Sequence, residues 1–282
     1  MIKNIIKGMV IGVANIIPGV SGGTMAVSMG IYDKLISSIT NLKKDFKNSI
    51  KFLLPLLVGM ALSIATLAFV IRFLFDEYPL QTNFLFIGLI IGGLPGMLKK
   101  VKGAKVTVGN IIPFILFFAI VVGFALIGDV ESAASADLSF GVMNITILFG
   151  VGVIAAATMV IPGVSGSMIL MLLGYYKPVI GAVSDFIKAV FKFNMTGILE
   201  GIGILLPFGL GVLVGIFVIA KMIEIVFSRW PMIAYFAIIG LIVASPIAII
   251  IMSNLGTITV AAVLTSVVTF AAGTFIALKL SE

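Results

Sequence analysis

Two short segments of the chain combine proline, glycine and hydroxyl side chains in a pattern suited to binding an anion. The sequence IIPGVSG at residues 16–22 recurs as VIPGVSG at residues 160–166. Gly23 and Thr24 follow the first copy, and Ser167 follows the second. Glycine lets the backbone turn and approach a ligand closely, and serine and threonine hydroxyls donate hydrogen bonds to anionic oxygens. The residues predicted to bind the anion are Pro18, Gly19, Ser21, Gly22, Gly23, Thr24, Pro162, Gly163, Ser165, Gly166 and Ser167.

The two segments are not fully symmetric, and a second interpretation of their glycines stays open. Asn15, one turn before Pro18, is a further polar candidate, but Met159 holds the equivalent position in the other segment. Small residues at the spacing of 19–22 and 163–166 also mark close packing between membrane helices. The recurrence of the whole pattern, proline included, favours a binding site over packing alone.

The same serines lie in a Gly-x-Ser-Gly setting, which resembles the nucleophile of intramembrane serine hydrolases. A serine needs a base to act as a nucleophile, and the chain contains no histidine. It contains no cysteine either, and no pair of acidic residues falls inside a span to hold a metal ion. We therefore predict no enzymatic activity, no catalytic residue, no metal and no cofactor. A hydrolase that uses Ser21 or Ser165 is the weaker alternative.

The elements that carry these segments are expected to lie in a membrane. Hydrophobic residues make up 61% of the 282-residue chain and charged residues only 10%, which is outside the range of soluble globular domains. A helix that crosses a bilayer needs about 20 apolar residues. Six such spans are expected near residues 52–75, 80–98, 107–128, 198–219, 232–252 and 257–278. The N-terminus shows no removable signal peptide, and the expected location is the bacterial cytoplasmic membrane.

Two further apolar segments, 5–33 and 141–176, are each interrupted by the proline-glycine pattern. Proline removes a backbone donor and clashes with the preceding turn, so Pro18 and Pro162 predict real breaks. Irregular backbone survives at membrane depth only inside protein or beside a water-filled cavity, so both breaks should face the centre of the bundle. We expect each segment to enter the membrane and return on the same side. In the alternative topology, residues 141–161 cross completely.

The chain consists of two similar halves, residues 1–128 and 138–282, joined by an outer loop at 129–137. Beyond the shared pattern, Leu-Leu-Pro at 53–55 matches Leu-Leu-Pro at 205–207. If each half holds one re-entrant segment and three spans, its three crossings leave the second half upside down. The predicted fold class is an all-α membrane protein with two inverted-topology repeats, each a broken re-entrant helix hairpin plus three transmembrane helices.

The distribution of lysine supports this inversion. Positive residues collect on the cytoplasmic side, which places the lysine-rich loops 34–51 and 99–105 inside, together with both chain termini. The counterpart of 99–105, around Ser253, has no lysine or arginine, although the counterpart of 34–51 carries three lysines within 177–192. The net charge of +7 is therefore interpreted as a topology signal rather than as a sign of nucleic-acid binding.

Two ionisable residues near the spans occupy matching positions in the halves. Arg72 aligns with Glu224, so the two could form a charge pair or a coupling site across the interface between the repeats. Alternatively, both lie near helix ends and extend toward the lipid headgroups.

The paired segments are similar to the signatures of the PopT family of polyprenyl-phosphate transporters. The similarity rests on GVANIIPGVSGGT at 12–24 and IPGVSGS at 161–167, and it covers essentially the whole chain. The resemblance implies a flippase that recycles undecaprenyl phosphate, a lipid of the bilayer, from the outer to the inner leaflet for cell-envelope synthesis. The residues alone predict only an anion held at the two breaks and moved by alternating access. A transporter or channel for a soluble anion such as phosphate or sulfate is the alternative.

Overall fold

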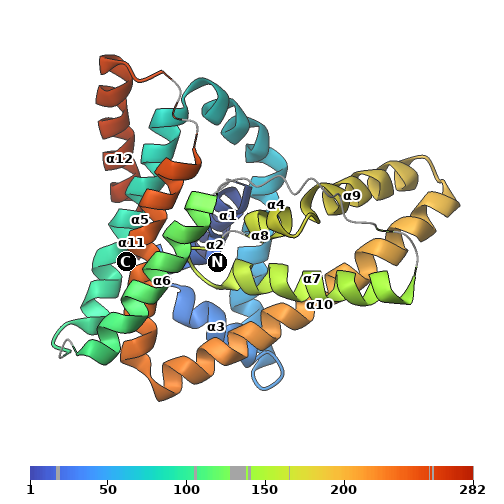
Figure 1. Ribbon diagram of the computed structural model, residues 1–282, viewed down its shortest axis with the longest axis horizontal. Coiled ribbons are helices and arrows are strands. Elements are labelled where there is room, and N and C mark those ends of the chain that lie inside the picture. The colour runs from blue at the N-terminus through green and yellow to red at the C-terminus, as the bar shows by residue number, and fades with distance from the viewer. Residues whose placement is uncertain are drawn as a thin grey trace. The chain divides into compact units, whose positions relative to one another are not determined.

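A computed structural model describes residues 1–16, 20–104, 107–127, 138, 141–164, 166–253, 255 and 257–281, without the side chains of Ile16, Ala68, Phe69, Arg72, Ser167 and Met168. The described part is helical and contains no strand, as predicted (Figure 1). Its helices are α1 (Ile2–Ile16), α2 (Gly22–Ser28), α3 (Tyr32–Thr40), α4 (Phe46–Glu77), α5 (Pro79–Val101), α6 (Val108–Ile127), α7 (Val142–Val160), α8 (Gly166–Leu172), α9 (Tyr176–Phe191), α10 (Met195–Arg229), α11 (Pro231–Met252) and α12 (Val260–Ser281).

Seven of the described helices are long and apolar enough to cross a membrane. Six of them, α4, α5, α6, α10, α11 and α12, cover the six spans expected from hydropathy. The seventh is α7, whose 19 residues lie within the segment that was expected to re-enter. The chain is thus a multi-pass membrane protein, and the length of α7 alone is compatible with either re-entry or complete crossing.

The chain packs as two compact units. Unit 1 comprises Met1–Gly128, Ile161–Val164 and Ala220–Glu282, and unit 2 comprises Asp129–Val160 and Ser165–Ile219. These units differ from the two halves predicted from sequence because the last helices of the second half pack against helices of the first half, within unit 1.

In unit 1, α1 and α2 form an antiparallel hairpin around the first break. Lys7 Nζ near the start of α1 donates to the carbonyl oxygen of Met29 after the end of α2, at 2.9 Å. At the other end of the hairpin, the Gly22 N–H donates to Oδ1 of Asn15 at 3.1 Å. The chain therefore turns back at the break, as the re-entrant prediction requires of this segment.

The glycines Gly30 and Gly174 end α2 and α8 in the same way. Both have positive φ, 66° and 76°, and the residue after each donates its N–H to a carbonyl five positions earlier. This arrangement satisfies carbonyls that a helix end leaves free, and glycine is favoured because a side chain disfavours positive φ. Its recurrence at matching positions supports the predicted duplication.

Within unit 1, the second and third spans of the two halves exchange partners. α12 packs along α5 and α6 packs along α11, so these four helices lie side by side (Figure 1). A Cβ at Gly88 of α5 would overlap the carbonyl oxygen of Phe270 in α12, and one at Gly240 of α11 would overlap that of Phe114 in α6. Backbones approach this closely only where a small residue lies between them.

The helices α5 and α11 run antiparallel. Ser253, which follows α11, donates to Oδ1 of Asn83 in the second turn of α5 at 2.8 Å. At the opposite end, Asp33 Oδ2 lies 3.4 Å from both Lys100 Nζ, in the last turn of α5, and the hydroxyl of Tyr235, in the second turn of α11. This direction is the one that an inverted repeat requires, and the inversion stays a prediction.

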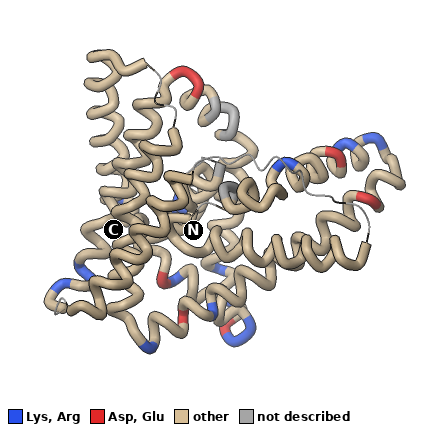
Figure 2. The backbone as a smooth tube through the Cα atoms, in the orientation of Figure 1, with Lys and Arg blue, Asp and Glu red and all other residues tan. Residues whose placement is uncertain are grey.

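Charged residues mark the two ends of α5. Lys99 and Lys100 lie in the last turn of α5, whereas Asp76 and Glu77 end α4, with only Tyr78 between Glu77 and the first residue of α5 (Figure 2). The end with the lysines is the one expected inside, and this orientation stays a prediction.

In unit 2, α7 packs closely against α10 through a glycine of each helix, and its end packs against α8. A Cβ at Gly152 would overlap the carbonyl oxygen of Phe208, and one at Gly211 would overlap that of Phe149. A Cβ at Gly166, the first residue of α8, would lie 3.1–3.4 Å from atoms of residues 155–159. The start of α8 is therefore packed back against the end of α7.

Candidate functional site

The two breaks meet within unit 1. The Gly163 N–H donates to Oγ1 of Thr24 at 2.7 Å, and Oγ of Ser21 lies 3.4 Å from the carbonyl oxygen of Ile161, to which it donates. These residues are about 140 positions apart in the chain. The structure thus brings together the two segments that the sequence pattern singled out.

The meeting point is shielded from solvent. Thr24 is fully buried, Ser21 is 4% exposed, and Pro162 ranks among the fully buried side chains. Hydrogen bonds between such groups are strong because water does not compete for them, and an unpaired group there would be costly. Every polar atom at this point therefore needs a partner, whether from the protein or from a ligand.

Gly163 shapes the second break. Its φ of 79° turns the chain after Pro162, and a Cβ at this residue would lie 3.1 Å from Cβ of Leu241 and 3.2 Å from Cγ2 of Val121. Leu241 and Val121 belong to a buried cluster that joins α6 and α11. The break is thus held between these two helices with its N–H directed at Thr24.

Asn15 has a definite structural role in the first break. Its Oδ1 accepts the N–H of Gly22, the first residue of α2, which a short helix would otherwise leave unsatisfied. Met159, at the equivalent position of the second segment, has no side-chain oxygen that could accept such a bond.

The remaining predicted site residues fall into two groups, those outside the described part of the chain and those within it. Pro18, Gly19 and Ser165 lie outside the described residues, as do the side chains of Ser167 and Arg72. The first-segment glycines Gly22 and Gly23 are buried in α2. Glu224 forms an ion pair with Lys221 in the same helix, and its pairing with Arg72 stays a prediction. Gly166 lies in unit 2 against the end of α7.

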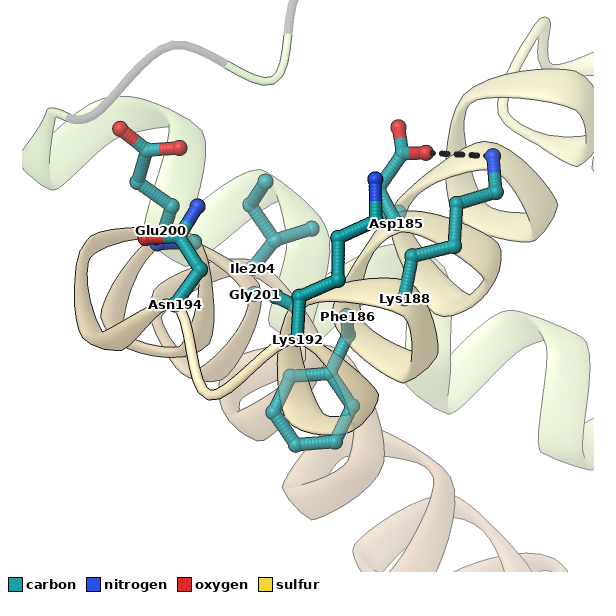
Figure 3. A pocket seen from close by; sticks show the side chains of 11 residues that line it. Asp185, Phe186, Lys188, Lys192, Asn194, Glu200, Gly201 and Ile204 are labelled. Carbon is teal, nitrogen blue, oxygen red and sulfur yellow. Dashed lines mark hydrogen bonds and ion pairs between the residues drawn. The ribbon is translucent and has the colours of Figure 1, made fainter.

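Unit 2 contains a cavity of about 330 Å³, lined by both charged and apolar residues, that sequence reasoning did not identify (Figure 3). It lies where α9 turns into α10; Asp185 and Lys188 of α9 pair across 3.1 Å, and Asn194 and Glu200 line its other side. Lys188 and Lys192 belong to the lysines that departed from the expected charge pattern. Two lysines balance two carboxylates here, so the cavity shows no net preference for an anion.

Lys7 is the other residue that the sequence analysis missed. Only 6% of its surface is exposed, and its ammonium lies at the end of the α1–α2 hairpin away from the break. A lysine close to the N-terminus is usually exposed to solvent and marks the cytoplasmic side. Its burial here results from the folding of α2 back along α1, which the sequence does not show.

The chemistry at the breaks is that of hydrogen-bond donors. The hydroxyls of Ser21 and Thr24 and the N–H of Gly163 can donate to an oxygen-rich anion once their mutual bonds open. Ser21 donates to a carbonyl and not to a base, so the described contacts do not activate it as a nucleophile. Among the described residues, no group of three or more acidic side chains could hold a metal ion.

Fold and site together define a multi-pass helical membrane protein in which residues of two helix breaks meet in a buried cluster within unit 1, an arrangement typical of transporters. The chain belongs to the VCA0040-like family, described as undecaprenyl phosphate translocase-like, whose profile matches residues 11–267. The resemblance identified from the paired segments is thereby confirmed.

Two relatives carry the name polyprenyl-phosphate transporter. The protein from Staphylococcus aureus is 32% identical over 249 residues, which cover 87% of this chain and 85% of the relative. The protein from Vibrio cholerae is 32% identical over 211 residues, which cover 70% of this chain and 65% of the relative. No solved structure matches the chain.

Proposed function

We propose that this protein translocates polyprenyl phosphate, specifically undecaprenyl phosphate, across the cytoplasmic membrane from the outer to the inner leaflet. The observation that carries the proposal is the direct bonding of the two breaks through Thr24 and Gly163. The substrate class follows from the family and from the two relatives that bear this name.

The headgroup binds where the breaks meet. Phosphate oxygens accept hydrogen bonds only, so they replace Oγ1 of Thr24 as the acceptor for the Gly163 N–H and the Ile161 carbonyl as the acceptor for Ser21. Thr24 then turns its own hydroxyl proton toward the phosphate. Glycines keep side chains away from this point, and the predicted partners Ser165 and Ser167 add further donors from the second segment.

The lipid tail stays in the bilayer while the headgroup crosses. Rocking of one repeat against the other would expose the site to each leaflet in turn, and a lateral opening would let the polyprenyl chain follow. The phosphate replaces hydrogen bonds that otherwise join the two breaks. Substrate binding is therefore coupled to the opening of the site. No bond of the substrate is broken, so the cycle needs no catalytic residue.

Reconstitution in liposomes tests the proposal. Wild-type protein is expected to move undecaprenyl phosphate between leaflets, and a variant with Ser21→Ala and Ser165→Ala is expected to be at least tenfold slower, since each lost bond to a charged group weakens binding by about 1.5–3 kcal/mol.

Ser245→Ala provides the matched control. Ser245 is also a buried serine in unit 1, but its hydroxyl donates only to the Leu241 carbonyl within its own helix. Its variant should transport like wild type. Wild-type protein that moves no lipid but binds inorganic phosphate or sulfate would replace the lipid assignment with transport of a soluble anion. Labelling of Ser21 by a serine-reactive phosphonate would instead support a hydrolase.

A further inference from the structure

Lys7 is a buried cation whose charge has no counterpart in the described part of the chain. Its side chain is almost fully covered, and its one hydrogen bond goes to the neutral carbonyl of Met29. An ammonium carries three N–H bonds, so two remain without a described protein acceptor. A buried ammonium with unused N–H bonds and no neighbouring negative charge is costly unless a further group accepts the hydrogen bonds and balances the charge.

The surroundings of Lys7 favour an anion. The nearest charged residue on its own helix is Lys3, one turn earlier, and like charges at this spacing repel. The described carboxylate close to this end of the bundle, Asp33, is already bonded to Lys100 and Tyr235. The carbonyl end of α2 supplies only a partial negative charge.

The position of Lys7 relates it to the breaks. The hairpin places Lys7 at one end of α2 and the break at the other, and a helix of seven residues is about 10 Å long. The donors at the break are all neutral, whereas a phosphate monoester carries nearly two negative charges at neutral pH. The hairpin thus holds hydrogen-bond donors at one end and the balancing charge at the other.

We propose that Lys7 forms a second phosphate-monoester subsite, which receives the headgroup after it leaves the breaks. The proposal rests on the function proposed above. The flexible stem of lysine lets its ammonium leave Met29 and meet the phosphate without rearrangement of the helix. The end of the hairpin that carries Lys7 is the one expected inside, so this subsite lies on the exit side of the path.

The decisive variant is Lys7→Gln. Glutamine keeps a donor for the Met29 carbonyl and removes the charge, so it separates a structural role from a binding role. Transport by Lys7→Gln in liposomes is expected to fall about tenfold to a hundredfold, with a melting temperature close to that of wild type. Lys7→Arg retains the charge and should recover at least part of the rate.

Binding is measured apart from transport with farnesyl monophosphate, a short soluble phosphate monoester. This ligand should raise the melting temperature of the wild type and raise that of Lys7→Gln much less, whereas farnesol, which lacks the phosphate, should affect both equally. Equal stabilisation of both proteins by farnesyl monophosphate, with unchanged transport, would overturn the proposal.

Two control variants complete the experiment. Lys3→Gln removes an exposed lysine of the same helix and should leave transport unchanged. Glu282→Gln tests the acidic residue that follows Ser281, whose carbonyl oxygen would lie 3.4 Å from a Cβ at Gly30. If Glu282→Gln loses transport as Lys7→Gln does, the charge of Lys7 balances the carboxylate of Glu282 and the proposed phosphate subsite is wrong. Failure of wild-type transport would count against the proposed function itself.

Discussion

At the scale of single residues, Thr24 holds the second break in place. Its hydroxyl is the acceptor for a buried backbone N–H, so Thr24→Val leaves that group unsatisfied while preserving the shape of the side chain. We expect the free energy of unfolding to fall by about 1–3 kcal/mol. Thr24→Ser retains the hydroxyl and should lose much less. Thermal unfolding in detergent measures both, and a larger loss for Thr24→Ser than for Thr24→Val would show that Thr24 acts through its methyl group.

Gly163 permits a second prediction, which separates backbone strain from packing. Gly163→Ala places a Cβ on a residue with positive φ and against Leu241 and Val121, whereas Gly103 has a φ of 84° with nothing within 4 Å. Gly103→Ala should therefore cost only the backbone term, about 1–2 kcal/mol. We expect Gly163→Ala to cost clearly more. Melting temperatures of the two variants provide the comparison, and equal shifts would argue against tight packing around the break.

The residues of the site were predictable to different degrees. Ser21 and Gly163 were recognised from their recurrence, because two copies of one pattern indicate a shared role, and Thr24 was recognised as a hydroxyl residue that follows the first copy. Their bonding to one another was not predictable, since it joins residues far apart in the chain. Lys7 was missed because the sequence does not show that α2 folds back over it.

At the scale of elements, the six spans followed from hydropathy because a bilayer demands about 20 apolar residues and little else. The exchanged packing of α12 on α5 and of α6 on α11 did not follow. Membrane helices are apolar on every side, so hydropathy does not reveal which faces pair. The signal lies in glycines such as Gly88 and Gly240, whose partners only the structure identifies.

Gly88 therefore provides the prediction for the helix interface. Gly88→Ala would force α5 away from the backbone of α12, and we expect a loss of roughly 1–3 kcal/mol or more in the free energy of unfolding. Gly96 lies in the same helix with nothing within 4 Å, so Gly96→Ala should be neutral or stabilising, because alanine favours the helix. Thermal unfolding of the two variants checks this, and a harmless Gly88→Ala would contradict close packing of these helices.

At the scale of the whole molecule, the ends of unit 1 indicate how the intervening chain crosses the membrane. The short loop after α5 starts α6 at the lysine-bearing end of α5, so α6 finishes at the opposite end. α11 starts again at the lysine-bearing end, beside Asp33 and Lys100. The chain between α6 and α11 must cross an odd number of times, and α10 supplies one crossing. We therefore expect α7 and α8 together to enter and return.

Because the chain contains no cysteine, labelling of single introduced cysteines tests this topology. A membrane-impermeant maleimide should label Glu77→Cys and Lys177→Cys in intact cells, and Gly103→Cys and Arg229→Cys only after permeabilisation. The first pair lies on the expected outer side and the second on the inner side. Labelling of Lys177→Cys only after permeabilisation would show that α7 crosses completely.

The pairing of α5 with α12 also constrains the order of biosynthesis. The glycine surface of α5 enters the membrane early, but its partner α12 leaves the ribosome much later. At bacterial rates of synthesis this surface waits on the order of ten seconds, covered only by lipid. The nascent chain therefore cannot reach its final packing before α12 has been synthesised, and a stop codon ahead of α12 would leave an intermediate exposed to quality-control proteases.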